Sequence, residues 1–99
     1  MEYVDDKFEW NLAKAVRNLR EHKVSFEEAA AAFVEPRAID DYLADDSHEE
    51  DRFKRLCLGA DGLLVVIYAE REDDHEITRV RIISVWRANK HEQARYNAG

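Results

Sequence analysis

The stretch at residues 52–68, RFKRLCLGADGLLVVIY, decides the fold, because it holds two apolar segments on either side of a turn. Residues 52–58 predict one strand. Residues 63–68 are β-branched and apolar on both faces, which is typical of a central strand. Asp61-Gly62 between them is a strong hairpin signal, because glycine tolerates the backbone angles of a tight turn. The stretch therefore predicts two neighbouring antiparallel strands.

More strands are expected on both sides of this hairpin. A charged loop at residues 70–76 precedes a further strand at residues 77–85. Upstream, residues 37–43 have weaker β character and lead into an acidic loop at residues 44–51. Near the N-terminus, residues 8–10 would end a first strand. Because consecutive strands are joined by short turns, we expect an antiparallel sheet.

The first predicted helix follows Asn11, whose side chain can cap free amides of the opening turn. An apolar stripe at helical spacing consists of Leu12, Ala15, Val16 and Leu19. Such a stripe usually faces the core, so we expect it to pack on the sheet. The helix is predicted to end near His22.

Two more helices complete the predicted fold. Ser25 and Glu28 have the spacing of a capping box for a second helix, which must end before Glu35-Pro36. Residues 89–96 predict a short terminal helix. The 99 residues suit one domain. We therefore expect a single α+β domain over residues 1–99, with its helices on one face of the sheet.

The charge of the chain is unevenly distributed. Residues 35–51 carry eight acidic side chains and one basic one, a charge of −7 that equals the net charge of the whole chain. From Thr78 onward, five bases face one acid. A net acidic protein repels nucleic acid at long range, but a locally basic end can still bind phosphate.

Cysteine content and hydropathy bear on location. Cys57 is the one cysteine of the chain, so no internal disulfide is possible, and we expect it to be a buried core residue. The longest apolar run, residues 63–69, is far shorter than the roughly 18 residues that a membrane helix needs. With no visible leader, the sequence predicts a cytoplasmic protein without a membrane partner.

Common metal and nucleotide signatures are missing from the sequence. His48-Glu49-Glu50-Asp51 could hold a metal on a loop, or could be a solvated acidic run. We expect neither a metal nor a cofactor. RNA cleavage requires neither, because a base can deprotonate the 2′-hydroxyl while cations stabilise the phosphorane and an acid protonates the leaving oxygen.

Arginines near strand ends are the candidates for phosphate binding, since a guanidinium grips two anionic oxygens at once. They are Arg52, Arg71 and Arg87, which could converge if neighbouring strand ends meet. Each could equally be a solubilising surface charge. Trp86 could stack on a base or pack in the core.

A polar stripe on the first helix provides further candidates. Lys14, Asn18 and His22 recur every four residues and therefore share one side of that helix. His22 is a candidate acid or base, because its ordinary pKa is near neutrality. Alternatively, the stripe faces solvent and His22 interacts with the helix dipole.

Three groups of motifs follow one another over residues 8–96. The first group is Phe8, Trp10-Asn11, Lys14, Asn18-Leu19, His22, Val24-Ser25-Phe26 and Ala29. The second is Glu50, Arg52-Phe53, Gly59, Leu64-Val65-Val66, Tyr68 and Glu70-Arg71. The third is Arg81-Ile82-Ile83-Ser84, Arg87-Ala88, Glu92 and Tyr96. In their order and spacing these motifs resemble BrnT-type toxins.

The resemblance implies a RelE-like fold, a metal-independent endoribonuclease that arrests growth, and a BrnA-type antitoxin as partner. It also implies a hetero-oligomer that contacts DNA only through the antitoxin. By position, the resemblance implies that Arg71 and Arg87 are catalytic basic residues and that Lys14, Asn18, His22 and Arg52 occupy recurrent polar positions. Our first hypothesis is that Arg71 and Arg87 stabilise the phosphorane, with His22 as a further candidate for proton transfer. In this hypothesis Lys14 and Arg52 bind flanking phosphates, and Trp86 stacks on a base.

The sequence departs from the family pattern at three places. Asn11 replaces an aspartate, which also caps helices. Lys23 replaces a glycine after the helix-ending histidine, and a left-handed conformation there would cost about 1 kcal/mol. The terminal helix is poorer in arginine. These departures and the excess acidity leave an alternative, a non-catalytic relative that binds a DNA-binding antitoxin and regulates its operon. A metal enzyme that uses the acidic loop is a third hypothesis.

Overall fold

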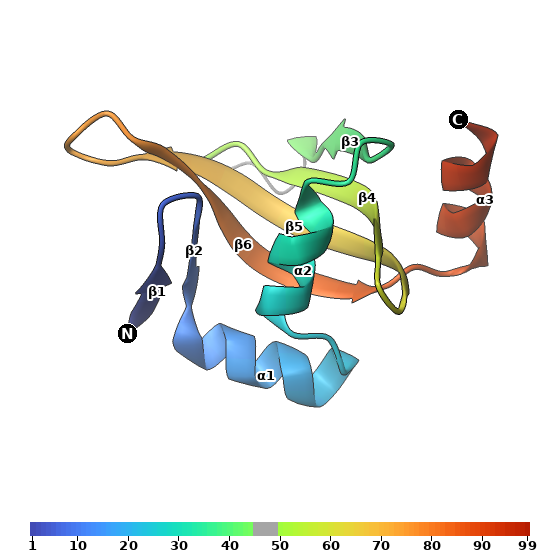
Figure 1. Cartoon of the computed structure of the whole chain (residues 1–99), viewed down its shortest axis with the longest axis horizontal. Coiled ribbons are helices and arrows are strands. Elements are labelled where there is room, and N and C mark those ends of the chain that lie inside the picture. The colour runs from blue at the N-terminus through green and yellow to red at the C-terminus, as the bar shows by residue number, and fades with distance from the viewer. Residues whose placement is uncertain (45–49) are drawn as a thin grey trace.

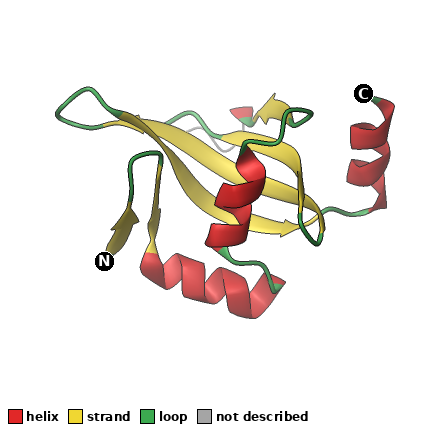
Figure 2. Ribbon diagram, viewed as in Figure 1, coloured by secondary structure: helices red, strands yellow, loops and turns green. Residues whose placement is uncertain are grey.

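A computed structural model describes residues 1–44 and 50–99, which form a six-stranded sheet and three helices (Figures 1 and 2). The strands are β1 (Glu2–Val4), β2 (Phe8–Asn11), β3 (Ile39–Tyr42), β4 (Phe53–Gly59), β5 (Gly62–Glu72) and β6 (Thr78–Arg87). The helices are α1 (Leu12–His22), α2 (Phe26–Phe33) and α3 (Lys90–Ala98). The predicted α+β class, with two N-terminal helices and a short C-terminal one, is confirmed.

The strands lie in the order β1-β2-β6-β5-β4-β3. Neighbours are antiparallel, as predicted, except that β2 pairs with β6 in parallel through Phe8↔Val80 and Glu9↔Arg81. The sheet is therefore mixed. Sequence patterns did not indicate this, because parallel neighbours are joined by long connections that carry no turn signal. The edge strand β1 was not expected either.

The hairpin at Asp61-Gly62 forms as predicted, with Gly62 at φ +127°. The next connection is shorter than expected, because β5 continues through Glu72 and β6 begins at Thr78. Asp73 closes it, since its Oδ1 accepts hydrogen bonds from the backbone amides of His75 and Ile77 at 2.8 and 3.0 Å. This Asx-type turn replaces the broad charged loop that the sequence predicted.

The helices do not share one face of the sheet, contrary to expectation. The larger core lies between the sheet and α2, which crosses in front of the strands in Figure 1. In this core Phe26 and Phe33 pack with residues such as Leu64 and Val66. A smaller cluster lies on the face opposite α2, where Tyr96 of α3 packs with Leu56, Val65 and Ala88. Strand β5 is apolar on both faces because one face packs in the larger core and the other packs in the smaller cluster.

Helix α1 packs against the sheet through a different side from the one predicted. Leu12, Val16 and Leu19 of the apolar stripe are 36, 66 and 50% exposed, whereas Asn18 is the one buried residue of the helix. Asn18 Nδ2 donates to the carbonyls of Val24 at 3.0 Å and Val85 at 2.8 Å, and Oδ1 accepts from the Val85 amide at 3.1 Å.

These bonds explain why α1 runs along the lower edge of the sheet in Figure 1. Strand β2 pairs with β6 only as far as Arg81, so no strand of residues 1–44 and 50–99 pairs with this edge of β6 beyond Arg81. Buried backbone groups must be paired, and Asn18 supplies to Val85 the donor and the acceptor that a strand would supply. The polar residue therefore turns toward the sheet, and the apolar stripe turns away.

Arg55 is a structural residue that no sequence pattern indicated. Its guanidinium binds both carboxylate oxygens of Asp40 at 2.8 and 2.9 Å and lies 3.9 Å from the centroid of the Phe33 ring. The Tyr68 hydroxyl also donates to Asp40, at 2.9 Å. Burial raises the pKa of Tyr68 to about 12, so this hydroxyl stays protonated and can donate.

Candidate functional site

Two adjoining hollows, with volumes of about 620 and 210 Å³, follow the junction of α1 with β6. We call them the α1–β6 groove. Its lining residues are Lys14, Arg17, Asn18, Glu21, His22, Ile83, Ser84, Trp86 and Arg87. Glu21 and His22 line both hollows, so the two lie side by side.

The groove brings together four of the six residues that the sequence singled out. Lys14 and His22 come from α1, and Trp86 and Arg87 end β6. The His22 ring centre lies 6.2 Å from that of Trp86, with the planes tilted by 45°. The hydrogen bonds from Asn18 to Val85 hold α1 beside this strand end, so they set the relative positions of all four residues.

Arg87 lies at the rim of the groove and points to the α2 side of the sheet. It is paired with Glu28 of α2, with Nη1 2.7 Å and Nη2 3.4 Å from the two carboxylate oxygens. Its side chain is 39% exposed, so solvent still reaches the guanidinium. A guanidinium that binds two carboxylate oxygens in this way can bind two phosphate oxygens equally well.

Trp86 both packs in the core and offers a surface for stacking on a base, the two alternatives left open by the sequence. It is half-buried and packs against the smaller core cluster, yet it also lines the larger hollow beside His22. One part of the indole therefore stabilises the fold, while another part is open to a ligand. An anchored aromatic ring of this kind is suited to stacking, because little side-chain freedom is lost when a ring binds to it.

Arg71 lies elsewhere, so the expectation that the three arginines converge is wrong. Arg71 pairs with Arg79 along the ladder, whereas Arg87 pairs with Leu64. Seven residues of β5 separate Leu64 from Arg71, which is about 23 Å along the strand. In an antiparallel pair, the end of one strand lies beside the start of the next, so the ends of β5 and β6 lie far apart.

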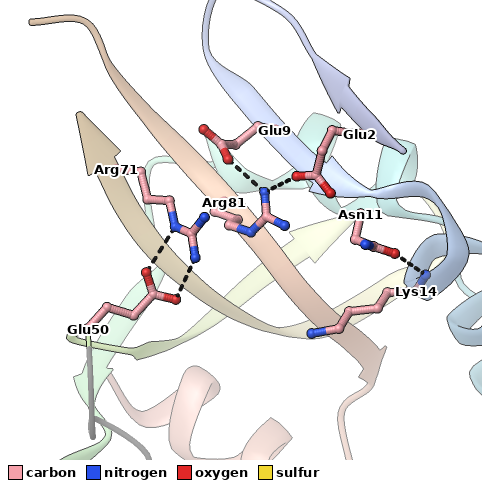
Figure 3. A network of polar contacts seen from close by, with 7 residues as sticks. All are labelled: Glu2, Glu9, Asn11, Lys14, Glu50, Arg71 and Arg81. Carbon is pink, nitrogen blue, oxygen red and sulfur yellow. Dashed lines mark hydrogen bonds and ion pairs between the residues drawn. The ribbon is translucent and has the colours of Figure 1, made fainter. Parts of the chain in front are cut away.

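Arg71 belongs to a second polar cluster, shown in Figure 3. Its Nε and Nη2 lie 3.0 and 3.3 Å from the carboxylate oxygens of Glu50. This hydrogen bonding lowers the pKa of Glu50, and the charges of Arg52 and Arg81 lower it further. Arg81 in turn binds Glu9, at 2.7 Å, and Glu2. The cluster thus brings Arg52 near Arg71 but away from Arg87.

Arg87 points to the α2 side, but Trp86 and Arg71 both lie on the opposite face of the sheet. Side chains alternate along β5, and Val65 belongs to the cluster opposite α2, so Arg71 also faces away from α2. Trp86 pairs with Val65 and lies on that same face. Figure 3 shows the Lys14 side chain pointing from α1 toward the strands. Basic side chains therefore occur at both ends of this face.

The model of the BrnT family, described as the ribonuclease toxin of a type II toxin–antitoxin system, matches residues 10–92. The chain belongs to the BrnT family. The match runs from the end of β2 into α3 and so includes every residue of the α1–β6 groove. No curated protein matches the chain significantly. Membership makes the protein a toxin of the ribonuclease class, with RNA as its substrate and an antitoxin as its partner.

Four groove or rim residues of this toxin escaped the sequence interpretation. They are Arg17, Glu21, Ser84 and Glu28. Arg17 and Glu21 follow Lys14 by three and seven residues, so helical spacing carried a signal for them. Glu28 was expected only to take part in capping, and its side chain instead reaches Arg87. Only the tertiary structure reveals that contact.

The sequence also raised the questions of a metal site and of a membrane-spanning helix. Within residues 1–44 and 50–99, no three or more His, Cys, Asp and Glu side chains form a group suited to a metal ion. His48 and Glu49, which the metal hypothesis used, lie outside the described residues. No helix in the described parts of the chain is long and apolar enough to cross a bilayer.

Proposed function

We propose that the α1–β6 groove binds a single RNA strand and cleaves it without a metal. The observation that carries this proposal is that His22, Trp86 and Arg87 line one hollow, and that Lys14 lines the adjoining hollow, which His22 also lines. These residues supply a cation, an acid–base group, a stacking surface and a guanidinium. Together they cover the needs of in-line attack by a 2′-hydroxyl.

In the proposed reaction, His22 accepts the proton of the 2′-hydroxyl as its oxygen bonds to the adjacent phosphorus. The bond from phosphorus to the 5′-oxygen breaks, and that oxygen takes a proton from a water molecule. The hydroxide that remains takes the proton back from His22, which restores the neutral imidazole. The products are a 2′,3′-cyclic phosphate and a 5′-hydroxyl. Arg87 stabilises the charge on the phosphorane, and Trp86 stacks on a neighbouring base.

Binding of flanking phosphates falls to the other basic residues. Lys14 and Arg17 line the groove beside the reaction centre. Arg71 is too far from Arg87 to share one phosphorane with it. We assign Arg71 and Arg52 to phosphates several nucleotides away along the same strand. The partner would be a BrnA-type antitoxin in a cytoplasmic hetero-oligomer, with DNA bound only through the antitoxin.

A second candidate function is a non-catalytic relative that only binds its antitoxin and regulates the operon. The observation that favours it is the pairing of both candidate catalytic arginines with carboxylates, Arg87 with Glu28 and Arg71 with Glu50. RNA phosphates must compete with these carboxylates. A protein that has lost its substrate can keep such pairs without cost.

Induced expression in bacteria separates the two candidates. We expect growth arrest with loss of intact RNA, reversed when the neighbouring antitoxin gene is expressed as well. Arg87→Gln removes the charge at the rim and should relieve the arrest at an equal level of soluble protein. Normal growth with intact RNA, despite soluble wild-type protein, would support the binding-only function instead.

A further inference from the structure

Helix α1 presents an apolar ridge that the fold does not use. The ridge consists of Leu12, Val16 and Leu19, which share one side of the helix at intervals of four and three residues. They are 36, 66 and 50% exposed. An exposed apolar patch of this kind, bordered by charged residues, is typical of a protein interface.

The ridge is exposed because α1 is fixed through its other side. Asn18 provides the buried contact with β6, and Ala15 packs against the main core. The Leu12 amide donates to the carbonyl of Met1 at 3.1 Å, so the exposed Met1 lies next to the N-terminal end of the ridge. Apolar surface therefore extends from the helix onto the start of the chain.

The charge around the ridge is opposite to that of the chain. Residues 12–23 carry four basic side chains and one acidic one, on a protein of net charge −7. Arg20 follows Val16 by four residues and therefore borders the ridge. Lys23 caps the end of the helix, and its Nζ donates to the Arg20 carbonyl at 2.8 Å, so a second cation lies at that end of the ridge. Charge complementarity therefore favours a partner surface with carboxylates beside its apolar side chains.

We propose that this ridge is the docking site for an amphipathic, acidic segment of the antitoxin. The partner segment places apolar side chains over Leu12, Val16 and Leu19 and carboxylates against Arg20 and Lys23. That the antitoxin inhibits through this contact rests on the proposed function. Lys14 follows Leu12 by two residues, or about 200° around α1, so the ridge and the wall of the α1–β6 groove are opposite sides of one helix.

The test compares Val16→Glu with Val34→Glu. Both valines are largely exposed, at 66 and 71%, but Val34 caps α2 and lies outside the ridge. Each variant is purified, its fold is checked by circular dichroism, and its affinity for the product of the neighbouring antitoxin gene is measured by calorimetry. We expect Val16→Glu to weaken binding at least tenfold and Val34→Glu to leave it within twofold of wild type.

Growth assays keep the two proposals distinguishable. Val16→Glu should still arrest growth, and the antitoxin should no longer reverse the arrest. Wild-type affinity of the folded Val16→Glu variant would overturn the docking proposal, whether or not the protein cleaves RNA. Sedimentation of the toxin alone provides a second check. A wild-type dimer that Val16→Glu converts to a monomer would assign the ridge to a second copy of the chain and overturn the proposal.

Discussion

Replacing Asn18 with alanine removes the side chain that joins α1 to the edge of β6. Three buried hydrogen bonds are lost, two from the Asn18 amide and one from the Val85 N–H. Three backbone groups lose their partner, namely the Val85 N–H, the Val85 C=O and the Val24 C=O. Leaving a buried polar group unsatisfied costs roughly 1–3 kcal/mol. We expect the free energy of unfolding to fall by about 3 kcal/mol in total.

Urea unfolding monitored by circular dichroism measures this loss. Total stability of such a domain is typically about 5–15 kcal/mol, so the variant should unfold at much lower urea with an unchanged m-value. Its melting temperature should fall by roughly 15 °C. Asn18→Asp retains the shape and the acceptor but loses both donated bonds, and it should also be strongly destabilised.

Asn89→Ala serves as the control. Asn89 caps the exposed helix α3 through a hydrogen bond from the Glu92 amide at 2.8 Å, and loss of such a cap costs about 1 kcal/mol. A loss of stability for Asn18→Ala no larger than that of the control would refute the reasoning. In that case Asn18 would not be the bridge that holds Lys14 and His22 beside Trp86.

Three further predictions concern single residues and pH. Lys23→Gly should raise the free energy of unfolding by up to about 1 kcal/mol, because Lys23 holds a left-handed φ of 60°; lower stability in urea would contradict this. Burial raises the pKa of Cys57 to about 12, so a thiol reagent at pH 8 should label it only as fast as the protein unfolds; rapid labelling of the native toxin would show otherwise. Hydrogen bonds hold the pKa values of Asp5, Asp41 and Asp73 below their usual range. The stability that these carboxylates add above about pH 4 should therefore be lost as the pH falls through the lowered pKa values. The free energy of unfolding, measured in urea at a series of acidic pH values, should decrease, and an increase would contradict the assignment.

Local features of the fold were predictable because local chemistry determines them. The Asp61-Gly62 turn needs only its own residues, and the caps Asn11 and Ser25 accept from amides three residues later. Lys23 takes the place of a family glycine, and its φ of 60° is left-handed, which is the conformation whose cost was considered from the sequence. Each of these features depends on atoms within a few residues, so the sequence pattern contains the necessary information.

Features that depend on distant partners were missed. The parallel pairing of β2 with β6 joins Phe8 to Val80, and the clamp of Arg55 joins three segments of the chain. The stripe at Leu12 and Val16 was wrongly expected in the core, because the same helical period suits a core and a partner surface. Only the position of α1 along the sheet edge decides between the two.

The candidate site was predictable in part. Lys14 and His22 share one helix side, and Trp86 is next to Arg87, so each pair follows from spacing. That the two pairs meet depends on Asn18. The assignment of Arg71 to the same phosphate ignored strand direction, which places it at the other end of the ladder.

Cleavage of RNA by the purified toxin in EDTA tests the central claim most directly. The rate at saturating RNA is compared for wild type, Arg87→Gln and Arg71→Gln. We expect wild-type cleavage to yield cyclic phosphate ends, and Arg87→Gln to lower kcat by about 10²-fold, as for loss of one group that stabilises transition-state charge. Arg71→Gln should instead raise KM with little change in kcat. Cleavage by Arg87→Gln at the wild-type kcat would contradict the assignment of the α1–β6 groove as the catalytic site.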